Sequence, residues 1–182
     1  GPRFLAALGI RPPPCTVVAS LFCYPHAPLD TLAAQLAGTD HRLWLVAPGR
    51  PADPGAWDSD TDALARRSGG RLQLIRVPFL SQDDYDTLLW SCDLNFVRGE
   101  DSWIRAIWAG QPFVWQPYPQ ADDAHRVKLD AFLAQLGPDD AALRLGRAMR
   151  WWSSPSPGHF TGRAPGSSPG DTLAADEAPL PA

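Results

Sequence analysis

Apolar residues along this chain fall into short continuous runs that alternate with segments of helical spacing. The runs are rich in Val, Leu, Ile and aromatic residues and have the length of buried strands; they are residues 16–24, 41–48, 71–79, 93–99 and 111–118. The segments with helical spacing are residues 28–38, 58–68, 81–92, 100–110 and 122–136. Strands that are apolar on both faces and alternate with helices predict a Rossmann-like α/β fold, a parallel sheet with helices on both faces.

Residues typical of helix ends agree with these boundaries. Ser81 precedes Asp84 by three positions, which approximates a capping box, and Gly38 and Gly110 stand where helices are expected to stop. The tryptophans of the predicted helices have a spacing that favours packing on the sheet, so we expect most of them in the core: Trp90, Trp103 and Trp108.

Composition divides the chain into three parts. Residues 15–150 carry the alternating pattern and predict one domain, which we expect to bind a ligand at its sheet edge. Residues 1–14 contain a run of prolines and are interpreted as a linker at the start of a fragment. Residues 151–182 are rich in Pro, Ser and Gly and poor in large apolar side chains, which predicts a disordered tail.

Charge and cysteine content exclude several classes of partner and site. A net charge of −4 and a pI of about 5.4 offer no basic field for nucleic acid or an anionic membrane. No stretch is apolar enough for a membrane span, and three cysteines without CxxC spacing argue against a disulfide framework or zinc site. We therefore expect a cytoplasmic protein.

Metal and hydrolase chemistry are not favoured either. The four histidines lack ligand spacing, and no serine elbow is present. Asp83, Asp84 and Asp86 fall near the start of a predicted helix, where acidic residues are favoured by the helix dipole. The sequence predicts no metal and no cofactor.

Ligands of open parallel sheets bind beyond the carboxyl ends of the strands. Gly99 follows one strand and allows a sharp turn, so the amides of Glu100, Asp101 and Ser102 are expected to open a helix as anion donors. Arg98 adds a fork of donors suited to phosphate. Glu100 is expected to accept hydrogen bonds from sugar hydroxyls and Asp101 to cap its own helix. An ordinary helix start, with Arg98 paired to one of the acids, explains the same spacing.

Aromatic residues follow two other strands. Phe22 and Tyr24 are two positions apart on one strand face, and Phe79 ends another strand, so a base could stack among these rings. Core packing is the commoner role of such side chains, and the spacing does not separate the two.

One long segment resembles a known family. PFLSQDDYDTLLWSCDLNFVRGEDSWIRAIWAGQPFVWQPYPQ, followed by DAHRVKLDAFL, is similar to the C-terminal domain of the arginine rhamnosyltransferases of elongation factor P. The likeness covers roughly residues 4–136. It implies one half of a GT-B glycosyltransferase, the half that binds the donor, and an inverting transfer of L-rhamnose from dTDP-rhamnose to an arginine of elongation factor P.

The resemblance also implies roles for individual residues. The residues it places around the donor are Phe22, Tyr24, Phe79, Gln82, Arg98, Glu100, Asp101, Ser102 and Tyr118. Arg98 and Glu100 would support catalysis, but the family's general base is an aspartate of the N-terminal domain, which is absent here. The resemblance therefore implies donor binding with little or no transfer. A different nucleotide-sugar transferase domain, or a non-catalytic remnant that binds, are the alternatives.

Overall fold

The computed structural model describes residues 1–49, 61–120 and 123–154. A parallel sheet runs through its centre, and its strands are β1 (Thr16–Leu21), β2 (Arg42–Pro48), β3 (Leu72–Val77), β4 (Leu94–Arg98) and β5 (Phe113–Gln116). The helices are α1 (Pro2–Ala7), α2 (Leu29–Ala37), α3 (Thr61–Arg67), α4 (Gln82–Ser91), α5 (Gly99–Ala109), α6 (Ala124–Leu133) and α7 (Asp140–Ser153).

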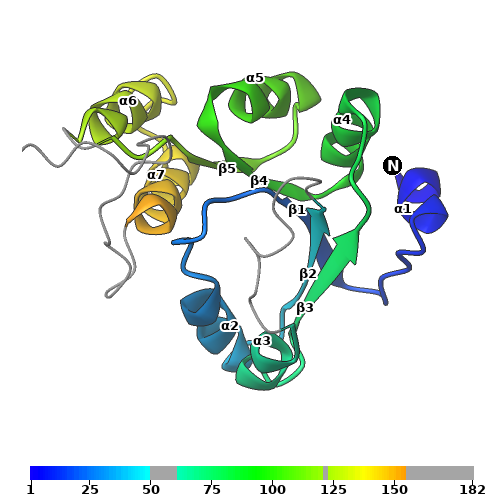
Figure 1. Ribbon diagram of the computed structural model, residues 1–182. Helices are drawn as coiled ribbons and strands as arrows, with labels where there is room; N and C mark the ends of the chain where they lie inside the picture. Colours follow the sequence, from blue (N-terminus) through cyan, green and yellow to red (C-terminus); the bar gives the residue numbers. More distant parts are fainter. Residues whose placement is uncertain (50–60, 121–122, 155–182) are drawn as a thin grey trace, which may run out of the picture.

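The strand order is β3-β2-β1-β4-β5, and every pairing is parallel. Figure 1 shows α4 and α5 over one face of the sheet and α2 and α3 over the other. The Rossmann-like α/β fold is therefore confirmed, with all five predicted strands and the helices between them. From β1 the chain adds β2 and β3 on one side of the sheet and then β4 and β5 on the other, so a topological switch point lies between the parallel strands β1 and β4, and such a switch point opens a crevice at the carboxyl edge.

Alternate side chains of β1, β2 and β3 enter different cores, as the two-residue period of a strand requires. In β1, Ala19 and Leu21 lie in the larger cluster, which also holds residues of α2 and α3, whereas Val18 lies in the smaller one. The smaller cluster includes Leu5 from α1 and Leu88 from α4. Both faces of the sheet are thus buried, which is why its strands read as continuous apolar runs.

Two ends of the chain differ from the prediction. Residues 1–14 are not only a linker, because α1 forms within them and buries Leu5, while Ile10 after it is buried as well. At the other end, α7 continues to Ser153, and the indole of Trp152 is fully buried with its ring centroid 4.4 Å from that of Phe96. The predicted start of the tail at residue 151 is therefore wrong, because the composition of the tail as a whole does not show that its first residues belong to the last turn of α7. The remainder of the predicted tail, from residue 155 on, lies outside the described residues.

The tryptophans of the helices are also distributed differently from the prediction. Trp103 stacks on Trp115 at a centroid distance of 4.4 Å, so it belongs to the core as expected. Trp90 is 54% exposed and Trp108 is 75% exposed, which contradicts the prediction for these two. Five residues separate Trp103 from Trp108, and at 3.6 residues per turn this spacing turns the second side chain by roughly 140° away from the first.

Candidate functional site

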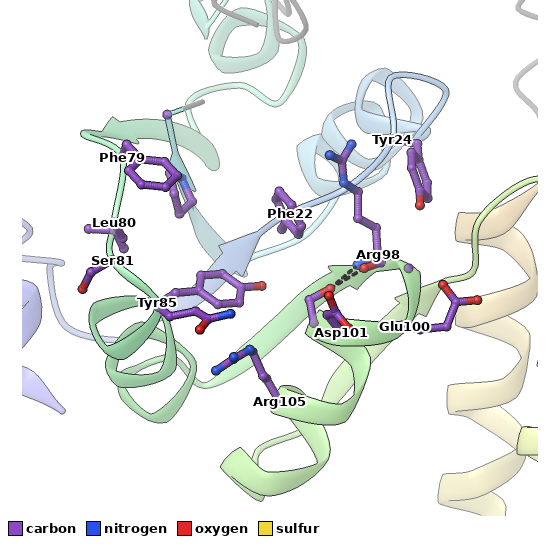
Figure 2. A pocket seen from close by; sticks show the side chains of 15 residues that line it. Phe22, Tyr24, Phe79, Leu80, Ser81, Tyr85, Arg98, Glu100, Asp101 and Arg105 are labelled. Atoms are coloured by element: carbon purple, nitrogen blue, oxygen red, sulfur yellow. Dashed lines mark hydrogen bonds between the residues drawn. The ribbon is translucent and has the colours of Figure 1, made fainter. Parts of the chain in front are cut away.

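A cavity of about 780 Å³ opens at the carboxyl edge of the sheet. Its walls come from the segments that follow β1, β2, β3 and β4, and from the first turns of α4 and α5 (Figure 2). The volume lies within the range of small-molecule sites, roughly 300–1,000 Å³. The cavity therefore occupies the place where a parallel sheet of this order is expected to hold a ligand.

The structure brings most of the predicted residues together in this cavity. Those that line it are Phe22, Tyr24, Phe79, Gln82, Arg98, Glu100, Asp101 and Ser102. Tyr118 does not line the cavity; its ring meets Tyr24 edge-on at a centroid distance of 5.9 Å. Tyr118 therefore contacts one residue of the wall but does not itself complete the cavity.

Arg98 is held between two aromatic rings. Its guanidinium carbon lies 4.4 Å from the ring centroid of Phe22 and 4.7 Å from that of Tyr24 (Figure 2). Its Nη1 donates to the carbonyl oxygen of Cys23 at 3.2 Å. Such stacking restrains a side chain that would otherwise be flexible, and a guanidinium carries five donors. Phe22 and Tyr24 thus orient the cation, whereas the spacing suggested that they form a wall for a base.

The turn after β4 is fixed by glycine and by Ser102. Gly99 has φ +63°, and a Cβ there would lie 3.4 Å from the hydroxyl of Tyr24. Ser102 Oγ accepts from the amide of Arg98 at 3.1 Å and donates to the carbonyl of Arg98. Trp115 Nε1 donates to the carbonyl of Gly99 at 2.8 Å. The Ser102 hydroxyl is therefore engaged in shaping the turn, although the residue lines the cavity.

The acidic residues of α5 are placed differently from the cap prediction. The helix is capped at Arg98 without a side-chain cap hydrogen bond, so the expected cap by Asp101 is wrong. Counted from this cap, the amides without an intrahelical acceptor are those of Gly99, Glu100 and Asp101, one position earlier than predicted. Glu100 Oε1 lies 3.4 Å from Lys128 Nζ in an exposed ion pair. The ordinary pairing of Arg98 with these acids does not occur within the described residues.

The opposite wall comes from the end of β3 and the start of α4. Phe79 is 65% exposed and lies across the cavity from Arg98 (Figure 2). Next to it, Ser81 caps α4: its Oγ accepts from the amide of Asp84 at 3.2 Å and donates to the Asp84 carboxylate at 2.8 Å. This confirms Ser81 as the N-cap of α4, although Asp84 accepts from the Ser81 hydroxyl and not from its backbone amide as in a full capping box. The cap presents Gln82 at the first turn of the helix.

Four lining residues were missed by the sequence reasoning: Pro48 and Gly49 at the end of β2, and two side chains of α4 and α5, Tyr85 and Arg105. Tyr85 meets Phe22 edge-on at a centroid distance of 5.9 Å, and burial raises the pKa of its hydroxyl. Arg105 Nη1 donates to both oxygens of Asp86, at 2.8 and 2.7 Å, and this hydrogen bond raises the pKa of Arg105. Tyr85 and Arg105 follow predicted residues by three or four positions on the same helices, so helical spacing was a signal that could have found them.

Membrane and metal features are absent from the part of the chain that the structure describes. None of its helices combines the length and apolarity that crossing a bilayer requires. Within residues 1–49, 61–120 and 123–154, no three His, Cys, Asp or Glu side chains gather as a metal site would need. Both findings concern the described ranges alone.

The fold and the site define a Rossmann-like α/β domain with an anion-suited pocket at the carboxyl edge of its sheet. The family model described as Elongation-Factor P (EF-P) rhamnosyltransferase EarP matches residues 2–165. The chain therefore belongs to this family, and the resemblance drawn from the sequence is confirmed.

Individual relatives agree with the family model. The protein-arginine rhamnosyltransferase of Pseudomonas putida is 42% identical over 156 residues, which cover 81% of this chain and 41% of the relative. That of Pseudomonas aeruginosa is 43% identical over 137 residues, 72% of this chain and 36% of the relative. A solved structure described as the structural basis for EarP-mediated arginine glycosylation of translation elongation factor EF-P has TM-score 0.58 and 33% identity, covering 84% of this chain and 59% of that one. The chain spans about two fifths of the curated relatives that it matches.

Proposed function

We propose that this chain is the donor-binding half of a GT-B glycosyltransferase that moves L-rhamnose from dTDP-rhamnose to an arginine of elongation factor P in the cytoplasm. The observation that carries the proposal is the arginine at the carboxyl edge of the sheet: Arg98, stacked between Phe22 and Tyr24, faces the cavity beside the start of α5. Membership of the EF-P rhamnosyltransferase family supports the choice of reaction.

The chemistry follows from where charge develops. When the anomeric carbon is attacked from the face opposite the diphosphate, the bond to the diphosphate breaks and negative charge grows on the leaving dTDP. Arg98 and the amides that open α5 are fixed donors in position to stabilise this charge, so no metal is required. Inversion at the anomeric carbon is part of the proposal.

The acceptor needs a separate group. A guanidinium has a pKa above about 12 and attacks poorly while it is protonated, so a carboxylate must polarise it or remove its proton. Glu100 lies in the cavity wall beside an ion-pair partner, Lys128, and we assign it a role with the sugar hydroxyls instead. In this proposal the base belongs to another domain of the enzyme, and this chain alone binds donor with little transfer.

Calorimetry with dTDP tests the proposal. We expect saturable binding in the millimolar range or tighter, and loss of the charged hydrogen bonds of Arg98 in Arg98→Ala should weaken binding on the order of 10- to 100-fold. Arg71→Ala is the control, because Arg71 pairs with Asp40 on the surface and does not line the cavity. Absent binding, or equal binding by wild type and Arg98→Ala, contradicts the proposal.

Comparison of nucleotides separates the alternatives. Thermal shift with dTDP, UDP and GDP at equal concentration should show the largest stabilisation with dTDP, because a ligand that binds the native state stabilises it more the more tightly it binds. A stronger effect of UDP or GDP favours another nucleotide-sugar transferase. No effect of any of the three favours a remnant that no longer binds a donor.

A further inference from the structure

The side-chain amide of Gln116, at the end of β5, joins three segments of the chain. Its residue is fully buried. Oε1 accepts from the amide of Tyr24 at 2.7 Å, and Nε2 donates to the carbonyl of Trp152 at 3.3 Å and lies 3.0 Å from Nε2 of His26. One side chain therefore connects the loop after β1 with the C-terminal turn of α7.

The partners fix the orientation of this amide. The Tyr24 amide can only donate and the Trp152 carbonyl can only accept, so the oxygen of Gln116 must face the first and its NH₂ group the second. The His26 nitrogen on the NH₂ side then acts as an acceptor. A buried amide with every polar atom engaged is costly to turn or to remove. The hydrogen bonds of Gln116 thus hold β5, the loop after β1 and α7 in a fixed arrangement.

The loop after β1, which Gln116 holds in place, is also the loop that orients Arg98. Tyr24 is bonded to Gln116 through its main chain, while its ring flanks the Arg98 guanidinium and its hydroxyl approaches Gly99. Gln116 itself does not line the cavity. Its influence on a ligand must therefore pass through Tyr24.

We infer that Gln116 is a positioning residue of the proposed donor site, which sets Tyr24 and thereby the direction in which Arg98 presents its donors. The inference rests on the proposed function. It makes α7 part of the site's support, because the same amide is bonded to the last turn of that helix.

The test uses the full chain and the nearly isosteric change Gln116→Met, which preserves volume and removes every hydrogen bond of the amide. We expect the Kd for dTDP to rise roughly tenfold, since the main-chain tie of Tyr24 is lost. The Nε–Hε resonance of Arg98, assigned by its disappearance in Arg98→Lys, reports directly on the ring currents of the flanking rings. This resonance should move in Gln116→Met even without ligand.

Two further variants separate positioning from stability. Gln116→Glu keeps the oxygen that accepts from the Tyr24 amide, but a carboxyl can replace at most one of the two N–H donors of the amide, so part of the affinity should return. Met149→Ala opens a cavity under α7, where Met149 is fully buried, but leaves the amide and its partners in place. It should lower the Tm while the Kd and the Arg98 resonance stay near wild type.

The outcomes are distinct. The inference is overturned if Gln116→Met retains wild-type affinity and an unmoved Arg98 resonance, or if Met149→Ala changes both as much as Gln116→Met does. Failure of Gln116→Glu to recover more affinity than Gln116→Met also contradicts it. If the wild-type chain does not bind dTDP, the proposed function fails, while the ligand-free resonance still decides whether Gln116 positions Arg98.

Discussion

Trp152→Ala should be one of the most destabilising single changes in the described part of the chain. The indole of Trp152 is fully buried, and its ring centroid lies 4.4 Å from that of Phe96. This contact anchors α7 on the sheet. A buried aromatic side chain removes roughly 150–250 Å² from water, worth about 4–6 kcal/mol at about 25 cal/mol per Å².

One buried polar atom lowers the expected loss of stability. The indole Nε1 of Trp152 has no hydrogen-bond partner within the described residues, and such a buried donor costs about 1–3 kcal/mol. Removing the ring removes that cost as well, so we expect a net loss of about 3 kcal/mol for Trp152→Ala, at the lower end of measured Trp→Ala effects. Trp152→Phe keeps most of the apolar contact and removes the unpaired donor, so its loss should stay under about 1.5 kcal/mol.

Urea denaturation followed by far-UV circular dichroism measures these differences. Trp108→Ala is the matched control, because Trp108 is 75% exposed on α5 and a surface substitution changes stability by about 0.5 kcal/mol or less. A loss below about 1 kcal/mol for Trp152→Ala, or a loss equal to that of Trp108→Ala, refutes the assignment of the last turn of α7 to the core.

Gly99→Ala should cost about 1–2 kcal/mol because φ is +63°, and strain in this turn should weaken dTDP binding by shifting the amides that open α5. Gly38→Ala is the control, because Gly38 has φ −89° and open space where a Cβ would lie, and it should lower neither the stability in urea melts nor the affinity in calorimetry. Cys15 is exposed and should react with a thiol reagent in the native state. Cys23 and Cys92 are buried, which raises the pKa of each thiol, so both should react only when the protein unfolds. Reaction of all three cysteines in the native state contradicts this prediction. Phe79→Ala should weaken dTDP roughly tenfold or more by loss of stacking and leave pyrophosphate binding unchanged in calorimetry; an equal loss for both contradicts the stacking role.

The sheet and its helices could be predicted because the information is local. The apolar runs of β1 to β5 and the caps at Ser81 and Gly110 act within a few residues, and the structure follows them closely. Burial of single helical residues depends instead on which face meets the sheet. Trp103 stacks on Trp115 of the sheet, and the helical rotation between positions 103 and 108 then places Trp108 on the exposed side of α5.

The candidate site was predictable in its place but less so in its contacts. Parallel strands bring their carboxyl ends to one edge, so residues far apart in sequence gather around the cavity as expected. The contacts among them depend on tertiary geometry that spacing does not contain. Nothing in the sequence indicated that Arg98 would lie between Phe22 and Tyr24, or that the buried amide of Gln116 would hold Tyr24.

Because the Arg98 guanidinium lies against Phe22 and Tyr24, and Tyr85 meets Phe22 edge-on, the exposed ring of Phe79 is the best candidate for stacking with a base in this cavity. Phe79 follows β3 and Arg98 ends β4, and β2 and β1 lie between these strands. Three strand spacings separate them, roughly 14 Å. A ligand that uses both ends must therefore be elongated, with its base on one side and its anionic group on the other. A nucleoside diphosphate has this shape, whereas a free sugar phosphate would reach Arg98 and leave Phe79 uncovered.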